Sequence, residues 1–190
     1  MKDGTGKGYL AQVNMDNRLV TTAISESIDS HINQKEGQSY SIIVSQTPTG
    51  AGDCFCYIRN LSTDFKIFIT SVKLYTAADE TIQVKLKDIG TTAGGTAYIP
   101  VNRNTGSTNL AAAIVEVGND ITGLAGGLVI DEFFVKGAST TEKFDWDSGL
   151  VIDTNQTATF YAVTGGIAVK MTVSMYYDTV FIYHVCLSHT

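Results

Sequence analysis

The residues best suited to binding a metal ion lie near the C-terminus, where His184, Cys186 and His189 occur close together. Imidazole nitrogens and thiolate sulfurs bind zinc, but a structural zinc site needs four ligands, and a catalytic site needs at least three with orienting partners. On an extended strand His184 and Cys186 would face one side and His189 the other, and His31 is far away in the sequence. We therefore predict that the protein has no metal site and needs no cofactor.

Candidate catalytic groups are also incomplete. Neither the Gly-x-Ser-x-Gly motif of hydrolases nor the His-Glu-x-x-His motif of metalloproteases occurs. The stretch 4–8, GTGKG, resembles part of a phosphate-binding loop but lacks the full spacing of that motif. Asp145 and Asp147 flank Trp146 and resemble a carboxylate pair, yet they lie in a predicted polar turn, where acidic side chains are usually solvated. We predict no catalytic residues and no enzymatic activity.

The aromatic side chains and the cysteines each allow two interpretations, one functional and one structural. Tyr98, Trp146 and Tyr161 could form a platform that stacks against sugar rings, but aromatic side chains more often pack in a core, and the sequence favours core packing. Cys54 and Cys56 lie two apart on a predicted strand, where a disulfide fits poorly. The chain has 3 cysteines, and we predict that all of them are reduced thiols that behave as small buried hydrophobic groups.

The composition limits the partners. The 190 residues carry a net charge of −6, with 17% charged and 44% hydrophobic residues. No block of Lys and Arg provides the phosphate-neutralising surface of a nucleic-acid or anionic-membrane binder. The first residues contain no apolar run of a signal peptide, and no stretch approaches the ~20 apolar residues of a membrane span. We expect a protein made in a cytoplasm, with neither nucleic acid nor membrane as its partner.

The chain is organised around residues 65–89, which predict two long strands joined by a polar turn at 76–80. From Ile82 onward apolar and polar residues alternate with the period of a strand that has one buried and one solvent-exposed face. In the first strand the parity of the apolar residues switches near Thr70 and Ser71, which predicts a β-bulge. We interpret this pair as a hairpin at the centre of the fold.

The remaining pattern is also strand-like. Gly165 and Gly166 are predicted to form a tight hairpin turn, and residues 111–117 are read as a strand that begins near Ala113. Further strands are predicted at residues 39–44, 54–60, 96–101, 128–136, 157–163 and 167–175. Another element is predicted to start at Phe144 and Trp146, with residues 150–152 preceding a turn at 153–156. Short strands at this spacing predict an all-β, antiparallel β-sandwich with a jelly-roll topology.

The sequence divides into three parts. Residues 1–38 predict an N-terminal arm with a small β-hairpin at 9–22, followed by an extended connector. Residues 39–177 predict the sandwich, and residues 178–190 predict a C-terminal tail with at most one extra strand. A two-stranded hairpin is only marginally stable alone, so the arm must lie on another surface.

Three groups of motifs resemble small structural proteins of tailed bacteriophages. The first is GTGKGYLAQVNMDNRL at 4–19, with HIN at 31–33 and GQSY at 37–40. The second is YIPVNRN at 98–104, followed by GS at 106–107 and GNDITGL at 118–124. The third is FYAVTGG at 160–166. The likeness extends over residues 4–177, and the last dozen residues match no part of it.

This resemblance implies a jelly-roll virion protein of the capsid decoration or cement type, which is often trimeric and sits on the outside of a capsid. Its partners would be the major capsid protein and two further copies of itself. Alternatives are another virion component, such as a tail or fibre protein that binds a receptor or glycan, and a jelly-roll lectin or carbohydrate-active protein. An aromatic-lined cleft with paired carboxylates would favour the carbohydrate-active alternative.

The arm is the expected attachment device. Its hairpin is too small to bury its own apolar side chains, and burial of each is worth roughly 1.5–3 kcal/mol. We predict that the arm docks on a neighbouring subunit or on the capsid rather than on its own sandwich. The predicted contact residues are Tyr9, Leu10, Val13, Leu19 and Val20.

Overall fold

The computed structural model describes residues 32–138 and 141–178. A short π-helical turn, η1 (Ile32–Glu36), precedes the first strand. The strands are β1 (Ser39–Gln46), β2 (Asp53–Asn60), β3 (Lys66–Thr76), β4 (Glu80–Leu86), β5 (Ile89–Ala93), β6 (Thr96–Ala97), β7 (Val101–Asn102), β8 (Ala113–Val117), β9 (Thr122–Ala125), β10 (Leu128–Val135), β11 (Glu142–Ile152), β12 (Thr157–Ala162) and β13 (Val169–Asp178). The prediction of an all-β protein is confirmed.

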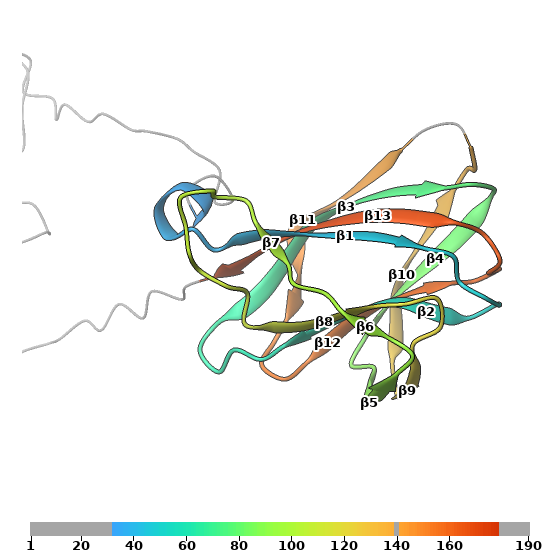
Figure 1. Ribbon diagram of the computed structural model, residues 1–190, viewed down its shortest axis with the longest axis horizontal. Helices are drawn as coiled ribbons and strands as arrows, with labels where there is room; N and C mark the ends of the chain where they lie inside the picture. Colours follow the sequence, from blue (N-terminus) through green and yellow to red (C-terminus); the bar gives the residue numbers. More distant parts are fainter. Residues whose placement is uncertain (1–31, 139–140, 179–190) are drawn as a thin grey trace, which may run out of the picture.

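Two antiparallel sheets face each other in a sandwich (Figure 1). One is five-stranded, in the order β11-β3-β13-β1-β7, and the other is six-stranded, in the order β10-β4-β12-β2-β8-β6. The separate β5–β9 pair packs by Ile121 and Leu124 on a second apolar cluster, which contains Tyr57 and Tyr161 of the six-stranded sheet. Both sides of that sheet are therefore covered along β12, whose residues are all buried.

The strand pairs are nested. β1 pairs with β13, β2 with β12, β3 with β11, and β4 with β10. As a result, β3 and β4 belong to different sheets, and so do β12 and β13. The predicted central hairpin at 65–89 is wrong, because its strands are joined by an arch between the sheets. The same correction applies to Gly165 and Gly166, which lie in an arch rather than in a hairpin turn.

Several local predictions hold because they depend only on local pattern. The register of β3 against β13 skips Thr70 between Ile69 and Ser71, which confirms the predicted bulge. β8 begins at Ala113, as predicted. The predicted strand at 96–101 is instead divided, because β6 pairs in one sheet and β7 in the other. Pro100 lies between them and has no N–H group to donate to a ladder.

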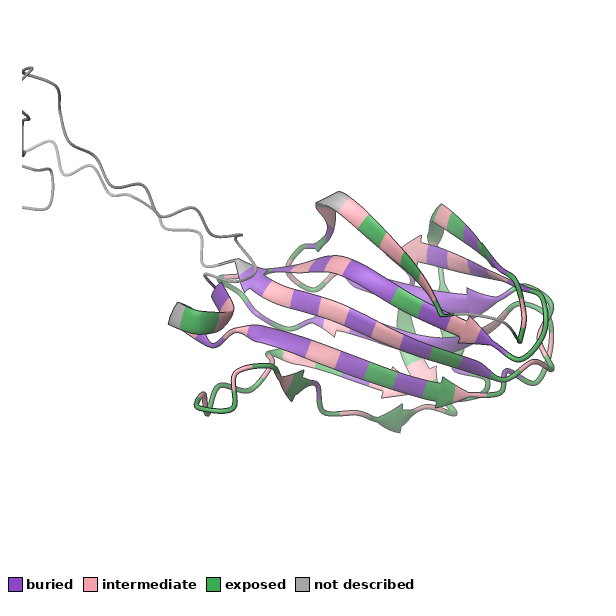
Figure 2. Ribbon diagram, turned by 90° about the horizontal axis from the view of Figure 1, so that it is seen from above, coloured by how far each residue is buried: buried purple, intermediate pink, exposed green. Residues whose placement is uncertain are grey.

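The core fills the space between the sheets with alternating side chains. Figure 2 shows buried residues alternating with more exposed ones along the strands of the five-stranded sheet. Val169, Met171, Val173 and Met175 are almost completely buried, as their period of two predicts. On neighbouring strands of the six-stranded sheet, the rings of Phe55 and Phe160 lie 6.5 Å apart at an interplanar angle of 44°. Within the described ranges, no helix is both long and apolar enough to span a membrane.

Candidate attachment and self-association surfaces

The end of β7 and the loop that follows it hold the chain segment that leads into β1. We call the four side chains that do this the asparagine clamp: Asn102, Asn104, Ser107 and Asn109. They donate hydrogen bonds of 2.8–3.1 Å to the carbonyl oxygens of Asn33, Glu36 and Gly37. Asn33 and Glu36 belong to η1 and Gly37 follows it, and the carbonyls of so short a helical turn lack intrahelical partners. The clamp therefore provides hydrogen-bond donors for the backbone carbonyls in and after η1 and holds this turn against the sandwich.

The clamp is itself rigid. The side-chain oxygen of Asn102 accepts a hydrogen bond from the Asn104 N–H at 2.8 Å, and that of Ser107 accepts one from the Asn109 N–H at 3.1 Å. Asn and Ser commonly form such turns with the backbone two residues further on. Gly37 has a φ of +59°, and a β-carbon there would collide with the Ser107 side chain. The close contact therefore requires glycine at position 37.

This contact corrects the predicted arm. Residues 32–36 form a helical turn rather than an extended connector, and Ile32 is only 4% exposed. The prediction that residues 1–38 lie on another subunit or on the capsid is wrong for 32–38, which contact their own sandwich. The physical reason is that the clamp supplies polar donors that the sequence pattern of 24–38 does not reveal.

The chain enters and leaves the sandwich at one end. Ser39 at the start of β1 pairs with Tyr176 near the end of β13, and η1 contacts β13 (Figure 1). Beside them, the rings of Tyr40 and Tyr177 meet edge to face at 5.8 Å. Burial raises the pKa of both tyrosines. Whatever residues 1–31 and 179–190 contact, they are attached to this end, which we call the exit end.

A second surface lies along one side of the sandwich. Among the strands that the structure describes, β10 is the edge strand of the six-stranded sheet and pairs only with β4. Its apolar residues Leu128, Val129, Ile130 and Phe134 are 43–61% exposed. The register shift between Val129 and Asp131 leaves Ile130 as a bulge residue. An exposed apolar edge strand is a surface that other chains can pair with or cover. We call these four residues the β10 edge.

The predicted contact residues Tyr9, Leu10, Val13, Leu19 and Val20 lie outside the described residues, and so do His31, His184, Cys186 and His189. Among the residues that the structure does describe, no cluster of His, Cys, Asp and Glu is large enough to bind a metal ion. Cys54 and Cys56 are buried free thiols. Burial raises the pKa of Cys54 to about 12, so this thiol stays protonated and unreactive at neutral pH.

The three aromatic residues weighed for sugar stacking belong to packed clusters. Tyr98 and Trp146 pack against the main core, and Tyr161 lies in the second cluster beneath β9. The indole N–H of Trp146 donates to Asp131 at 3.1 Å. Asp145 lies on β11 rather than in a turn and forms an ion pair with Lys143. The three aromatic side chains pack in clusters, as the sequence favoured, and Asp145 forms an ion pair.

Two buried carboxylates escaped the sequence-based analysis. Glu80 is 1% exposed and accepts hydrogen bonds from the N–H groups of Thr81, Thr164 and Gly165 at 2.8–3.0 Å. It thereby joins the β3–β4 arch to the β12–β13 arch. Asp88 is 3% exposed and accepts hydrogen bonds from the hydroxyls of Thr159 and Tyr161. Both look like loop acids in the sequence, and only the sheet topology brings them to their donors.

Comparison with known proteins adds no assignment to these surfaces: no family model, no curated protein and no solved structure matches the chain.

Proposed function

We propose that this chain is a structural virion protein, a decoration or cement protein that binds the outer surface of a bacteriophage capsid and bridges neighbouring capsid subunits. The observation that carries the proposal is the exit end. Both terminal segments are attached there, and the asparagine clamp fixes the point at which the first one begins. Two segments that leave one end of a rigid body can reach different neighbours on the same surface.

The energetics of such a bridge follow from multivalency. When one segment is bound, the second binds at a high effective concentration, provided that both sites are within reach. Each contact is then allowed to be weak while the whole molecule stays attached. A rigid clamp helps, because a fixed origin reduces the conformational entropy that the arm loses on binding.

The topology supports the family on which the proposal draws. Nested antiparallel pairs, with successive strands alternating between two sheets, are the pairing expected of a jelly roll. We therefore infer a jelly-roll sandwich for residues 39–177, with the major capsid protein as its partner. The proposed location is the capsid surface of a virion assembled in a bacterial cytoplasm.

A direct test is sedimentation of the purified protein with capsids that lack it. We expect the protein to co-sediment at stoichiometric occupancy and to raise the temperature at which the capsids disrupt. Binding to isolated tails or to host glycans, without binding to capsids, would contradict the proposal and favour the tail or fibre alternative.

We further propose a homotrimer that buries the β10 edge, and we expect the double substitution Ile130→Lys and Phe134→Lys to dissociate it. Both side chains point away from the core, so the sandwich keeps its stability. Two buried charges at an interface raise the dissociation constant at least about a hundredfold, because they must be desolvated without partners. Sedimentation velocity at micromolar concentration measures the change from trimer to monomer.

The matched control is Ile99→Lys with Leu110→Lys. These side chains are 76% and 81% exposed and lie outside the β10 edge, so the same chemical change leaves the trimer intact. A native protein that is monomeric over the micromolar range would contradict the trimer. A trimer that survives Ile130→Lys and Phe134→Lys would exclude this edge as its interface.

A further inference from the structure

A cleft on the outer side of the six-stranded sheet has the properties of a ligand site. Its volume is about 440 Å³, within the range of pockets that bind small molecules. It lies at one end of β2, near the β5 strand and the turn before β12. The lining residues are Tyr57, Arg59, Lys87, Ile89, Gly90, Asn155 and Gln156. Two of them are cations, and two carry side-chain amides.

The two cations lack carboxylate partners in the part of the chain that the structure describes. Within residues 32–138 and 141–178, neither Arg59 nor Lys87 forms an ion pair. The carboxylate of Glu116 accepts a hydrogen bond from the Thr92 hydroxyl at 2.7 Å, and that of Asp88 is bound by Thr159 and Tyr161. Each of these two carboxylates, whose charges also raise the pKa of Tyr57, thus accepts a hydrogen bond from a group other than Arg59 and Lys87.

The Arg59 guanidinium is partly built into the floor of the cleft. Its Nε atom is buried and has no hydrogen-bond partner among the described residues. The guanidinium group can donate hydrogen bonds to a ligand through its other two nitrogens. Burial raises the pKa of Tyr57, while the charge of Arg59 and its hydrogen bond to the phenol act in the opposite direction. The Tyr57 hydroxyl thus remains a neutral polar group beside the cation.

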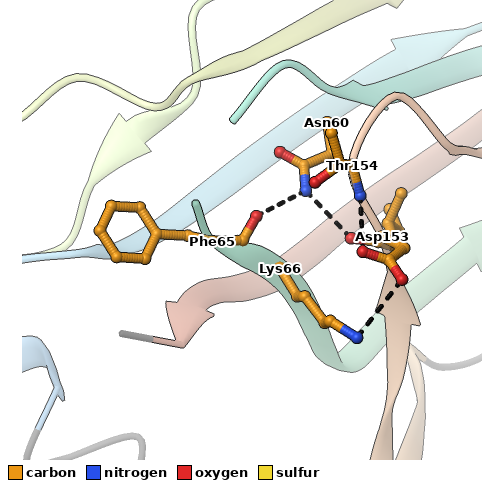
Figure 3. A network of polar contacts seen from close by, with 6 residues as sticks. Asn60, Phe65, Lys66, Asp153 and Thr154 are labelled. Atoms are coloured by element: carbon orange, nitrogen blue, oxygen red, sulfur yellow. Dashed lines mark hydrogen bonds and ion pairs between the residues drawn. The ribbon is translucent and has the colours of Figure 1, made fainter. Parts of the chain in front are cut away.

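The wall that carries the amides is fixed. Figure 3 shows the buried Asn60 side chain donating to the carbonyls of Phe65 and Ile152, at 2.9 and 3.1 Å, while Lys66 pairs with Asp153. The Asn60 backbone also exchanges hydrogen bonds with Asn155 and Gln156, at 3.0 and 3.1 Å. The turn that presents these two amides to the cleft is therefore preorganised, which reduces the entropy lost on binding.

We propose that this cleft binds a small polyhydroxylated carboxylate, that is, an acidic sugar. A carboxylate matches the planar fork of Arg59, and Lys87 adds a second positive charge. Asn155 and Gln156 offer both donors and acceptors, which is the chemistry that sugar hydroxyls require. The site is separate from the exit end and the β10 edge, so the proposal of an acidic-sugar ligand does not depend on capsid binding.

The test is an NMR titration of the full chain with glucuronate, with glucose and inorganic phosphate as comparison ligands. Glucuronate and glucose differ in the carboxylate, and phosphate reports a general anion site. We expect saturable shifts of the amide signals of residues 87–90 and 155–156 with glucuronate at millimolar concentration, and at least about tenfold weaker binding of glucose. Equal binding of glucose, or preferred binding of phosphate, would overturn the assignment.

Two variants locate the site. Lys87 has a φ of +60°, which Asn tolerates well, so Lys87→Asn removes the charge without backbone strain. We expect it and Arg59→Gln each to weaken glucuronate binding about tenfold or more. Lys136→Asn removes the same charge from an exposed position outside the cleft and leaves binding unchanged. Native affinity in Lys87→Asn and Arg59→Gln, with amide spectra that show an intact fold, would also overturn the proposal.

Discussion

We expect a chain that begins at Ile32 to fold into the same sandwich and to lose its attachment to capsids. The deletion removes the predicted contact residues Tyr9, Leu10, Val13, Leu19 and Val20 but keeps every partner of the asparagine clamp. Loss of two buried apolar side chains alone costs about 3 kcal/mol, or more than a hundredfold in affinity. Co-sedimentation with capsids measures binding, and circular dichroism checks the β-structure.

A second deletion, of residues 1–38, is the matched comparison. It removes Asn33, Glu36 and Gly37, whose carbonyls the clamp binds, and the buried Ile32. We expect this shorter chain to lose about 2–4 kcal/mol of folding stability in addition to its binding. If the chain that begins at Ile32 binds capsids as tightly as the full chain, the arm is not the attachment device. If both deletions are equally stable, the clamp contributes nothing to the fold.

The second large effect is expected at Glu80, where substitution by alanine should lower the free energy of unfolding by about 3 kcal/mol. The change leaves the N–H groups of Thr81, Thr164 and Gly165 without their shared acceptor. Hydrogen bonds to a charged group contribute about 1.5–3 kcal/mol each, and water recovers part of the loss where the arch is exposed. Urea unfolding followed by tryptophan fluorescence gives the midpoint and slope.

Two controls separate the carboxylate from the side chain that carries it. Glu80→Gln keeps one acceptor oxygen and is expected to lose about half as much stability. Glu132→Ala removes an exposed carboxylate from the neighbouring strand β10 and is expected to change stability by less than about 0.5 kcal/mol. Equal stability of the native chain and Glu80→Ala would mean that the two arches are held together by other contacts.

The strands could be predicted from the sequence, because alternation is a local property. Ile82 and Val84 point into the core as their period requires, and the parity switch at Thr70 marks the bulge correctly. The partners of the strands could not be predicted in this way. The alternation of apolar and polar residues is compatible with any neighbouring strand. The arch at 76–80 is also as polar as a hairpin loop would be. The pairing of β3 with β11 and β13 depends on residues far away in the chain.

The candidate surfaces show the same division. The β10 edge contains a visible run of apolar residues at 128–130, but its exposure follows from its place at the edge of the sheet. Glu80 is buried because the β12–β13 arch brings Thr164 and Gly165 to it. Asn102 and Asn109 look like ordinary loop residues until η1 supplies carbonyls to bind. In each case the chemistry is local, whereas the partner is set by topology.

The nested pairing also determines when this protein can fold. β1 pairs with β13, so the first strand of the sandwich can form these backbone hydrogen bonds only after the last strand has been synthesised. A ribosome must therefore release almost the whole chain before the five-stranded sheet can close. Folds dominated by such distant contacts form slowly, on a scale of milliseconds to seconds or longer. Until then β1 and β3 remain open to pairing with other nascent copies. Rapid synthesis at high concentration consequently favours aggregation, and lower growth temperature during expression should increase the soluble yield.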